Sequence, residues 1–204
     1  KPLLHHTLQV FSVCEVIDYV VLVMPQADVD ESGDEWLHGY DVVRKVVAGG
    51  PQRQDSVYNG FQALEESTEI AVVHDGVRPF TTAEMIKETV EAAEQHGAAI
   101  TAIPVSDTVK QVVEGFVERT VPREGLWRVQ TPQAFQCGLL QKAFAKARED
   151  SYYGTDEGGL VEYLGKQVKI VSGSELNIKI TRKEDLILGE SLLCLGSQSR
   201  KRGR

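Results

Sequence analysis

The sequence has few cysteines, no long apolar run and no excess of basic residues. Its three cysteines, Cys14, Cys137 and Cys194, lack the spacing of a metal-binding pair, so we expect buried thiols in a reducing compartment. No apolar run approaches the roughly 20 residues of a membrane-spanning helix, so no membrane association is expected. Lys and Arg number 22 against 30 Asp and Glu, and this net charge of -8 disfavours nucleic-acid binding, which needs a basic face. A small phosphorylated ligand needs only a few local cations and is compatible with this charge.

The pattern of apolar residues predicts one α/β domain across residues 1–204. A chain of 204 residues with 42% hydrophobic residues is long enough to bury a sizeable core. Apolar runs without polar alternation predict buried strands at residues 19–24, 70–73 and 98–103. Because helical periodicity separates these runs, we expect a Rossmann-like, mostly parallel sheet flanked by helices.

Local signals predict the remaining elements. Periodicity and charge predict a helix at 2–11, an acidic loop at 28–33, a helix at 36–44, and short strands at 46–48 and 167–171. Three threonines are predicted helix N-caps: Thr81, Thr155 and Thr181, the first and third with a glutamate three residues later. Residues 176–180 alternate, which predicts a strand with Asn177 and Lys179 on one face. The polar, basic residues 197–204 predict a disordered tail.

Beyond residue 104 the pattern changes to that of a β-hairpin. Val109, Gln111 and Val113 alternate, Glu114 and Gly115 make a turn, and alternation resumes over 117–121. We therefore expect a hairpin arm at about residues 106–123, inserted into the α/β chain. An isolated two-stranded ribbon is marginally stable in water, so a partner subunit is expected to cover it.

The end of one predicted strand carries charged residues. The apolar run 70–73 is followed at once by His74, Asp75 and Gly76, and then by Arg78. Ligands of open α/β sheets bind beyond the carboxyl ends of the strands. A carboxylate and a guanidinium at that point suggest a phosphorylated ligand that carries magnesium.

A glycine pair precedes another predicted helix. Gly49 and Gly50 let the backbone approach a ligand closely, and Pro51 suits a first helical turn. Arg53 and Ser56 follow, and a helix N-terminus with such residues can bind an anion. Because glycine pairs also precede helices that bind nothing, this signal alone leaves both interpretations open.

Together the motifs resemble one family. The matching segments, in order, are GGPQRQDSV (49–57), VHDGVRPF (73–80), PVSDTVK (104–110), VPREGLWRVQTPQAF (121–135), TDEGGLVEYLG (155–165) and NIKITRKEDL (177–186). They resemble the 2-C-methyl-D-erythritol 4-phosphate cytidylyltransferases. The resemblance implies an enzyme of the non-mevalonate isoprenoid pathway that joins CTP and methylerythritol phosphate, giving CDP-methylerythritol and pyrophosphate with Mg²⁺. It also implies a homodimer whose arm reaches over the partner's active site.

The resemblance assigns roles to individual residues. Lys179 and Arg123 are the expected catalytic residues; Lys179 contacts the nucleotide phosphate, and Arg123 holds the sugar phosphate from the neighbouring subunit. The substrate-binding residues it implies, besides these two, are Asp75, Arg78, Thr108, Thr131 and Thr155. The nucleotide-binding residues it implies, besides Lys179, are Gly49, Gly50, Arg53, Ser56 and Gly76. Asp75 is also expected to help hold Mg²⁺. The substrate's own phosphate attacks in line, so no enzyme nucleophile is needed and catalysis rests on positioning and electrostatics.

The resemblance is incomplete at the start of the chain. The family opens with a strand and a glycine-rich loop whose Arg and Lys stabilise the triphosphate, and this sequence begins at the following helix. Such a strand would lie between those at 19–24 and 70–73, and its loss would leave backbone groups unpaired in mid-sheet. We therefore expect a further segment before Lys1. A cytoplasmic location is expected, or a plastid one if that segment includes a transit peptide.

Two other functions fit parts of the sequence. The sister family that uses ribitol 5-phosphate shares the nucleotide pocket and the His-Asp-x-x-Arg-Pro element. Lys110 and the pair Leu126-Trp127 favour the methylerythritol phosphate enzymes. A non-catalytic nucleotide-binding protein is the third interpretation, and the presence of Asp75, Arg123 and Lys179 disfavours it.

Overall fold

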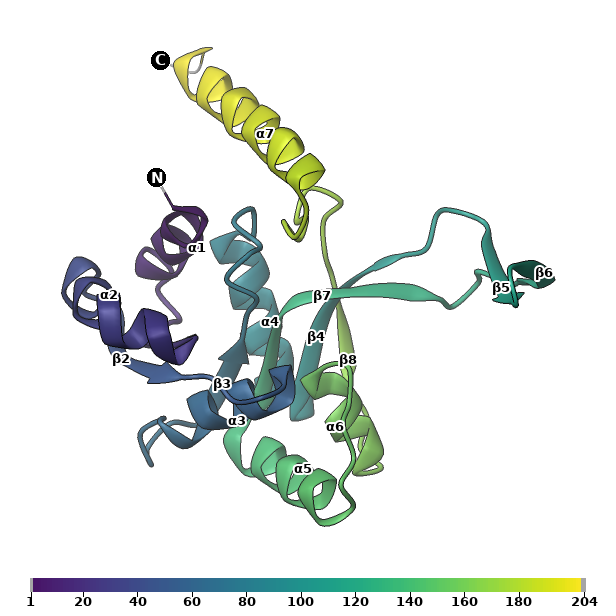
Figure 1. Ribbon diagram of the computed structural model, residues 1–204, viewed down its shortest axis with the longest axis horizontal. Helices are drawn as coiled ribbons and strands as arrows, with labels where there is room; N and C mark the ends of the chain where they lie inside the picture. The colour runs from purple at the N-terminus through teal and green to yellow at the C-terminus, as the bar shows by residue number, and fades with distance from the viewer. Residues whose placement is uncertain (1, 203–204) are drawn as a thin grey trace.

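In the computed structural model, which describes residues 2–202, helices cover a central sheet and a hairpin extends away from it (Figure 1). The helices are α1 (Leu3–Ser12), α2 (Gln26–Gly39), α3 (Arg53–Gln62), α4 (Ala83–His96), α5 (Cys137–Glu149), α6 (Glu157–Tyr163) and α7 (Lys183–Arg202). The strands are β1 (Val20–Met24), β2 (Val43–Ala48), β3 (Ile70–Val73), β4 (Ala98–Pro104), β5 (Val109–Val113), β6 (Phe116–Val121), β7 (Trp127–Gln136) and β8 (Lys169–Ser172).

The strands confirm a mixed α/β fold with one unforeseen strand. The main sheet has the order β3-β7-β4-β8, in which β8 is parallel to β4 while β7 is antiparallel to both β3 and β4. Strands β1 and β2 form a separate parallel pair. The interpretation of residues 70–73 as a strand is confirmed, but its described neighbour, β7, is antiparallel. Sequence patterns missed β7 because Pro132 lies within it, and proline normally argues against a central strand.

An irregularity in the pairing of β7 with β4 accommodates that proline. Gln133 pairs with Ile100 and Val129 pairs with Ala102, so three residues of β7 face one residue of β4. The extra residues, including Pro132, form a bulge, which commonly redirects side chains beside a binding site. Here it turns Gln130 and Thr131 toward the site described below.

The core lies on both faces of the main sheet. Adjacent residues of a strand point to opposite faces, and in β7 these are Ala134 and Phe135. Phe135 packs in a cluster with Leu140 and Phe144 of α5 and with residues of α6, while Ala134 packs with α1 and α4. Full burial of an aromatic or branched side chain contributes about 1.5–3 kcal/mol to the free energy of folding, so the packing on both faces stabilises the sheet.

The hairpin prediction is confirmed, and the arm is exposed. Strands β5 and β6 pair antiparallel around Glu114 and Gly115, both of which have positive φ, as a tight two-residue hairpin turn requires. The hairpin lies at the end of a long extended stretch, away from the sheet and helices (Figure 1). Phe116 and Val117 are 79% and 61% exposed, which is unusual for large apolar side chains.

Several predicted boundaries were wrong. Residues 28–33 are not a loop, because α2 covers them and ends at Gly39, and β2 takes up residues 43–48. Pro25 directly precedes α2 and no proline interrupts the helix, and its polar Asp and Glu residues can face solvent. The predicted disordered tail is helical through Arg202 within the described residues, and 203–204 lie outside them. Lys and Arg favour helix, especially near its C-terminus.

At each predicted helix start, the capping residue lies one position after the predicted one. Thr82, rather than Thr81, caps α4 and accepts a hydrogen bond from the Met85 N–H. Asp156, rather than Thr155, caps α6. Asp185, rather than Glu184, accepts the N–H groups of residues 181 and 182. Each motif offers two neighbouring polar residues that could cap, and the position of the helix axis decides between them.

The segment 176–180 is not a strand. It is an extended connection outside the described sheets, with a backbone hydrogen bond from Ile180 N–H to Val77 O. Asn177 is fully buried and donates to Thr131 O, while the side chain of Lys179 is 41% exposed. The two side chains therefore do not share one exposed face, as alternation had predicted, although both lie close to the end of β3.

Of the three cysteines only Cys14 is buried. Cys137 is half-buried and Cys194 is exposed, so the expectation of buried thiols holds for one of them. Within residues 2–202 no helix is both long and apolar enough to span a bilayer.

Candidate functional site

Two cavities meet beyond the carboxyl end of β3. The first, of about 1350 Å³, lies among α1, β1, β3 and α3. The second, of about 570 Å³, lies among β7, the start of α6 and the extended connection that carries Lys179. Arg53 and Asp75 line both cavities, so these two side chains stand where the cavities meet.

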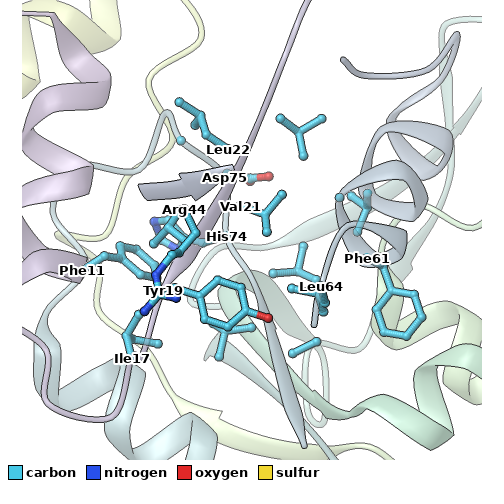
Figure 2. A pocket seen from close by; sticks show the side chains of 18 of the residues that line it. Phe11, Ile17, Tyr19, Val21, Leu22, Arg44, Phe61, Leu64, His74 and Asp75 are labelled. Atoms are coloured by element: carbon cyan, nitrogen blue, oxygen red, sulfur yellow. The ribbon is translucent and has the colours of Figure 1, made fainter. Parts of the chain in front are cut away.

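The first cavity separates β1 from β3. Within the described residues, β1 pairs with β2 and β3 pairs with β7, and both strands line the cavity along their length. Apolar side chains such as Leu22, Phe61 and Leu64 surround most of it, with Asp75 among the charged residues (Figure 2). The cavity is therefore at the place where the sequence predicted a further strand.

The predicted nucleotide-binding residues line this first cavity, except Lys179, which lines the second. Gly49, Gly50, Ser56 and Gly76 all border it. The Gly50 N–H donates to Ser56 Oγ at 3.0 Å, which fixes the loop before α3. A Cβ added at Gly50 would lie 2.4 Å from Asp55 Cβ, so this position requires glycine.

Three cations surround the carboxylate of Asp75. Lys179 Nζ lies 3.0 Å from Asp75 Oδ2, Arg78 Nε lies 3.4 Å from the same oxygen, and Arg53 Nη2 lies 3.8 Å from Oδ1. Burial alone would raise the pKa of Asp75, but Lys179, Arg53 and Arg78 together hold that pKa below its ordinary value. The cluster thus has a net positive charge from these four side chains and suits an anionic ligand.

Arg78 is held by the backbone as well as by Asp75. Its Nη1 donates to Asn177 O at 2.8 Å, which joins the loop after β3 to the connection carrying Lys179. Burial lowers the pKa of Arg78, and Asp75 opposes that effect. Asp75, Arg78 and Lys179, to which the resemblance assigns substrate binding, all line the second cavity.

His74 holds the loop after β3 through hydrogen bonds at both of its ring nitrogens. Its Nε2 lies 3.2 Å from Arg78 O and its Nδ1 lies 3.0 Å from Thr131 Oγ1, which in turn accepts the Asp75 N–H at 3.1 Å. Burial lowers the pKa of His74 to about 4, so the ring is neutral at pH 7, donates through Nε2 and accepts through Nδ1. Both ring nitrogens of His74 are thus hydrogen-bonded within the protein, and they orient Thr131 and the loop at Arg78.

The predicted sugar-phosphate residues lie in the second cavity, apart from those on the arm. Arg78, Thr131, Thr155 and Lys179 border it. Asp156 supplies the cap of α6 through the Gly159 N–H, so the cap does not require the exposed hydroxyl of Thr155. Thr108 and Arg123 belong to the arm. Within the part of the chain that the structure describes, neither residue lines either cavity. Arg123 instead donates to Ser106 O in its own arm.

Glu157 is a charged residue of this region that the sequence interpretation did not single out. It is fully buried and pairs with Arg53 through two hydrogen bonds of 2.8 and 2.9 Å. A signal was present, because Glu157 shares one helix face with Leu160 and Val161, which are also buried. A carboxylate on such a face needs a cationic partner.

The described residues do not form a metal site of their own. They include no group of three His, Cys, Asp or Glu side chains that could hold an ion. The expected ligand, Asp75, is already surrounded by Lys179, Arg78 and Arg53. A divalent ion held mainly by protein oxygens does not fit this donor set.

Known proteins resemble the chain over most of its length. The model of the 2-C-methyl-D-erythritol 4-phosphate cytidylyltransferase family matches residues 1–194. A protein of that name from Syntrophus aciditrophicus is 46% identical over 195 residues, covering 94% of this chain and 83% of the relative. One from Alkaliphilus metalliredigens is 45% identical over 196 residues, covering 95% and 81%.

Solved structures agree with the sequence comparisons. The 4-diphosphocytidyl-2C-methyl-D-erythritol synthase of Anaerococcus prevotii matches with a TM-score of 0.86 and 35% identity, covering 95% of this chain and 86% of that one. The 2-C-methyl-D-erythritol 4-phosphate cytidylyltransferase of Thermus thermophilus matches with a TM-score of 0.82 and 34% identity, covering 95% and 89%. The chain belongs to the 2-C-methyl-D-erythritol 4-phosphate cytidylyltransferase family.

Proposed function

We propose that this chain is a nucleotidyltransferase that joins CTP and 2-C-methyl-D-erythritol 4-phosphate, in the non-mevalonate isoprenoid pathway. An oxygen of the sugar phosphate attacks the α-phosphorus of CTP, the bond from that phosphorus to the β-phosphate oxygen breaks, and pyrophosphate leaves. The observation that carries this proposal is the meeting of two cavities at Arg53 and Asp75, with Lys179 beside Asp75 in the second cavity. Two phosphorylated molecules can meet there beside shared cations.

The first cavity takes the nucleotide at its polar end. Gly49, Gly50 and Gly76 leave room for close backbone contact with the base and ribose, and Ser56 offers a hydroxyl. Arg53, in the first turn of α3, adds positive charge where the helix dipole already favours anions. The apolar remainder of this cavity lies between β1 and β3.

The second cavity takes the sugar phosphate. Thr155 supplies an exposed hydroxyl, Thr131 Oγ1 keeps one lone pair that can accept a hydrogen bond, and Arg78 and Lys179 supply charge. Lys179 pairs with Asp75 and lines the second cavity. Its ammonium group draws the attacking phosphate toward the α-phosphorus and stabilises the negative charge that develops on the phosphates in the transition state. Asp75 holds Lys179 and Arg78 in place, so the cations are oriented before substrate arrives.

Magnesium is proposed as the metal that accompanies CTP. It would be bound by phosphate oxygens and water, as Mg²⁺ commonly is, because the described side chains lack a site for it. Its chemistry would be to neutralise phosphate charge, while the protein's own residues bind and orient the two substrates.

A second copy of the chain is proposed to complete each site. The arm exposes Val112, Val113, Phe116 and Val117, and an apolar ribbon of this kind gains stability when covered. Thr108 and Arg123 lie on that arm, so a partner's arm would bring them over the second cavity. The net charge of -8 disfavours nucleic acid and anionic membranes as partners, while local cations suffice for the phosphorylated substrates, and a reducing cytoplasm suits the thiols.

Mixing two inactive variants tests the shared site. Arg123→Ala and Lys179→Ala homodimers are each expected to be nearly inactive. After subunit exchange, a mixed dimer contains one site with both residues intact, so activity should return to roughly a quarter of wild type in an equal mixture. An activity no higher than that of the separate variants would mean that Arg123 serves its own subunit.

Substrate choice tests the function itself. Ribitol 5-phosphate is the second candidate substrate, and the residues that favour methylerythritol phosphate are Lys110 in the arm and the pair Leu126-Trp127 after it. We expect the natural full-length protein to use methylerythritol phosphate with a higher kcat/KM. A preference for ribitol phosphate would replace the proposed function, and CTP binding without pyrophosphate release would identify a non-catalytic protein.

A further inference from the structure

Glu157 is a buried carboxylate that contacts neither cavity within the described residues. Its side chain is 1% exposed, and its two oxygens accept from Arg53 Nη1 at 2.8 Å and Nη2 at 2.9 Å. A two-bond pairing of this kind fixes the plane of a guanidinium, which a single bond does not. Burial would lower the pKa of Arg53, but the hydrogen bonds and charge of Glu157 keep it above its ordinary value.

The two residues that flank Glu157 are anchored to the main sheet. Asp156 Oδ2 accepts from Gln133 Nε2 at 2.8 Å, and the Gly158 N–H donates to Gln133 Oε1 at 3.2 Å. Residues on both sides of Glu157 are thus bonded to one side chain of β7. Strand β7 also carries Thr131, which lines the second cavity. The hydrogen bonds through Gln133 therefore fix Glu157, and with it Arg53, relative to that cavity.

Arg53 is the group through which Glu157 can act. Its guanidinium lies at the junction of the two cavities, where Nη2 is also 3.8 Å from Asp75 Oδ1. With a side chain 38% exposed, Arg53 would have several rotamers available without a rigid partner. A carboxylate fixed in the core removes that freedom.

We propose that Glu157 is a positioning residue, which orients the Arg53 guanidinium across the junction so that it faces the CTP phosphates. This inference rests on the proposed function. Glu157 touches no substrate and exchanges no proton; it holds one cation in place before the substrates bind.

The first test is Glu157→Gln in the natural full-length protein. Glutamine keeps the volume but turns one acceptor into a donor facing Arg53, so one of two hydrogen bonds is lost. We expect kcat/KM for CTP to fall roughly 10- to 100-fold, as for small misplacements of a binding group, while KM for methylerythritol phosphate changes little. Glu175→Gln is the matched control, since it disrupts an exposed pair with Arg128 (2.6 Å) outside both cavities, and it should retain full activity.

A double-mutant cycle shows whether Glu157 acts through Arg53. Arg53→Ala should lower activity strongly, and adding Glu157→Gln to it should cause no further loss. Wild-type kcat/KM in Glu157→Gln, or a full additional loss in the double variant, would overturn the proposal.

A spectroscopic measurement separates this inference from the proposed function. Two-bond pairing slows rotation of the guanidinium, so Arg53 Nη–H signals should be visible by ¹⁵N NMR in wild type and lost in Glu157→Gln. If the wild type makes no CDP-methylerythritol, the proposed function fails while this measurement still decides the pairing. Unchanged Arg53 signals in the variant would overturn the positioning role whatever the activity.

Discussion

Replacing Lys179 by alanine should separate catalysis from stability. Lys179 Nζ lies 3.0 Å from Asp75 Oδ2, but its side chain is 41% exposed and no core cluster includes it among the described residues. If this ammonium stabilises the transferring phosphoryl group, its loss should affect the reaction far more than the fold.

The structure gives the size of each effect. The lysine is partly exposed although Asp75 is mostly buried, and Asp75 keeps Arg53 and Arg78 as partners, so no buried charge is left alone and the loss of stability should be about 1 kcal/mol. For a protein of this size that corresponds to a fall in Tm of about 2–4 °C. Removing one preorganised donor from a transition state typically costs about 2.7–4 kcal/mol, or roughly 10²- to 10³-fold in kcat.

Pyrophosphate release and thermal unfolding measure the two effects on the same samples. Lys87→Ala is the matched control, because Lys87 forms an exposed pair with Glu91 at 3.9 Å on α4. The control should match wild type in both assays. A Lys179→Ala protein with kcat within threefold of wild type would refute the assigned role, and a fall in Tm well beyond that range would show that the lysine is structural.

Two further predictions concern pH and the glycine pair. Burial lowers the pKa of His74 from 6.5, its value in the unfolded chain, to about 4 in the folded protein. As the pH falls from 6.5 to about 4, the unfolded chain therefore takes up a proton that the folded protein does not, and the free energy of unfolding should decrease. His74→Gln should show a smaller fall by urea titration; an equal fall would contradict this assignment. Gly50→Ala should weaken CTP binding about tenfold or more in calorimetry, because its Cβ would meet Asp55 at 2.4 Å. Gly138→Ala, with nothing within 4 Å in α5, should bind CTP normally, and equal affinities for both variants would show that the glycine is dispensable.

Patterns that depend on short stretches of sequence predicted much of the fold. The apolar runs predicted β1, β3 and β4, because a strand that is packed on both faces has apolar side chains at nearly every position. Alternation around Glu114 and Gly115 gave the hairpin. The cluster of Asp75, Arg78 and Lys179 could be anticipated from motifs of the resembled family, although Lys179 is far from the other two residues in the chain.

What could not be predicted depends on contacts between distant elements. Strand β7 contains Pro132, and only its bulge against β4 shows how the sheet accommodates it. Local propensity did not choose between Thr155 and Asp156 as the cap of α6. The pairing of Glu157 with Arg53 spans 104 positions, so neither residue's neighbourhood indicates the other.

The stereochemistry of transfer tests most directly whether two substrates react with each other at the junction of the two cavities. CTP with a sulfur in place of one α-phosphate oxygen, in a single configuration, would be converted by the natural full-length protein. Direct in-line attack by the sugar phosphate predicts inverted configuration at phosphorus in the product. Retention would mean two successive displacements through a nucleotidyl-enzyme, which this arrangement of Arg53, Asp75 and Lys179 does not provide for, and would contradict the proposed mechanism.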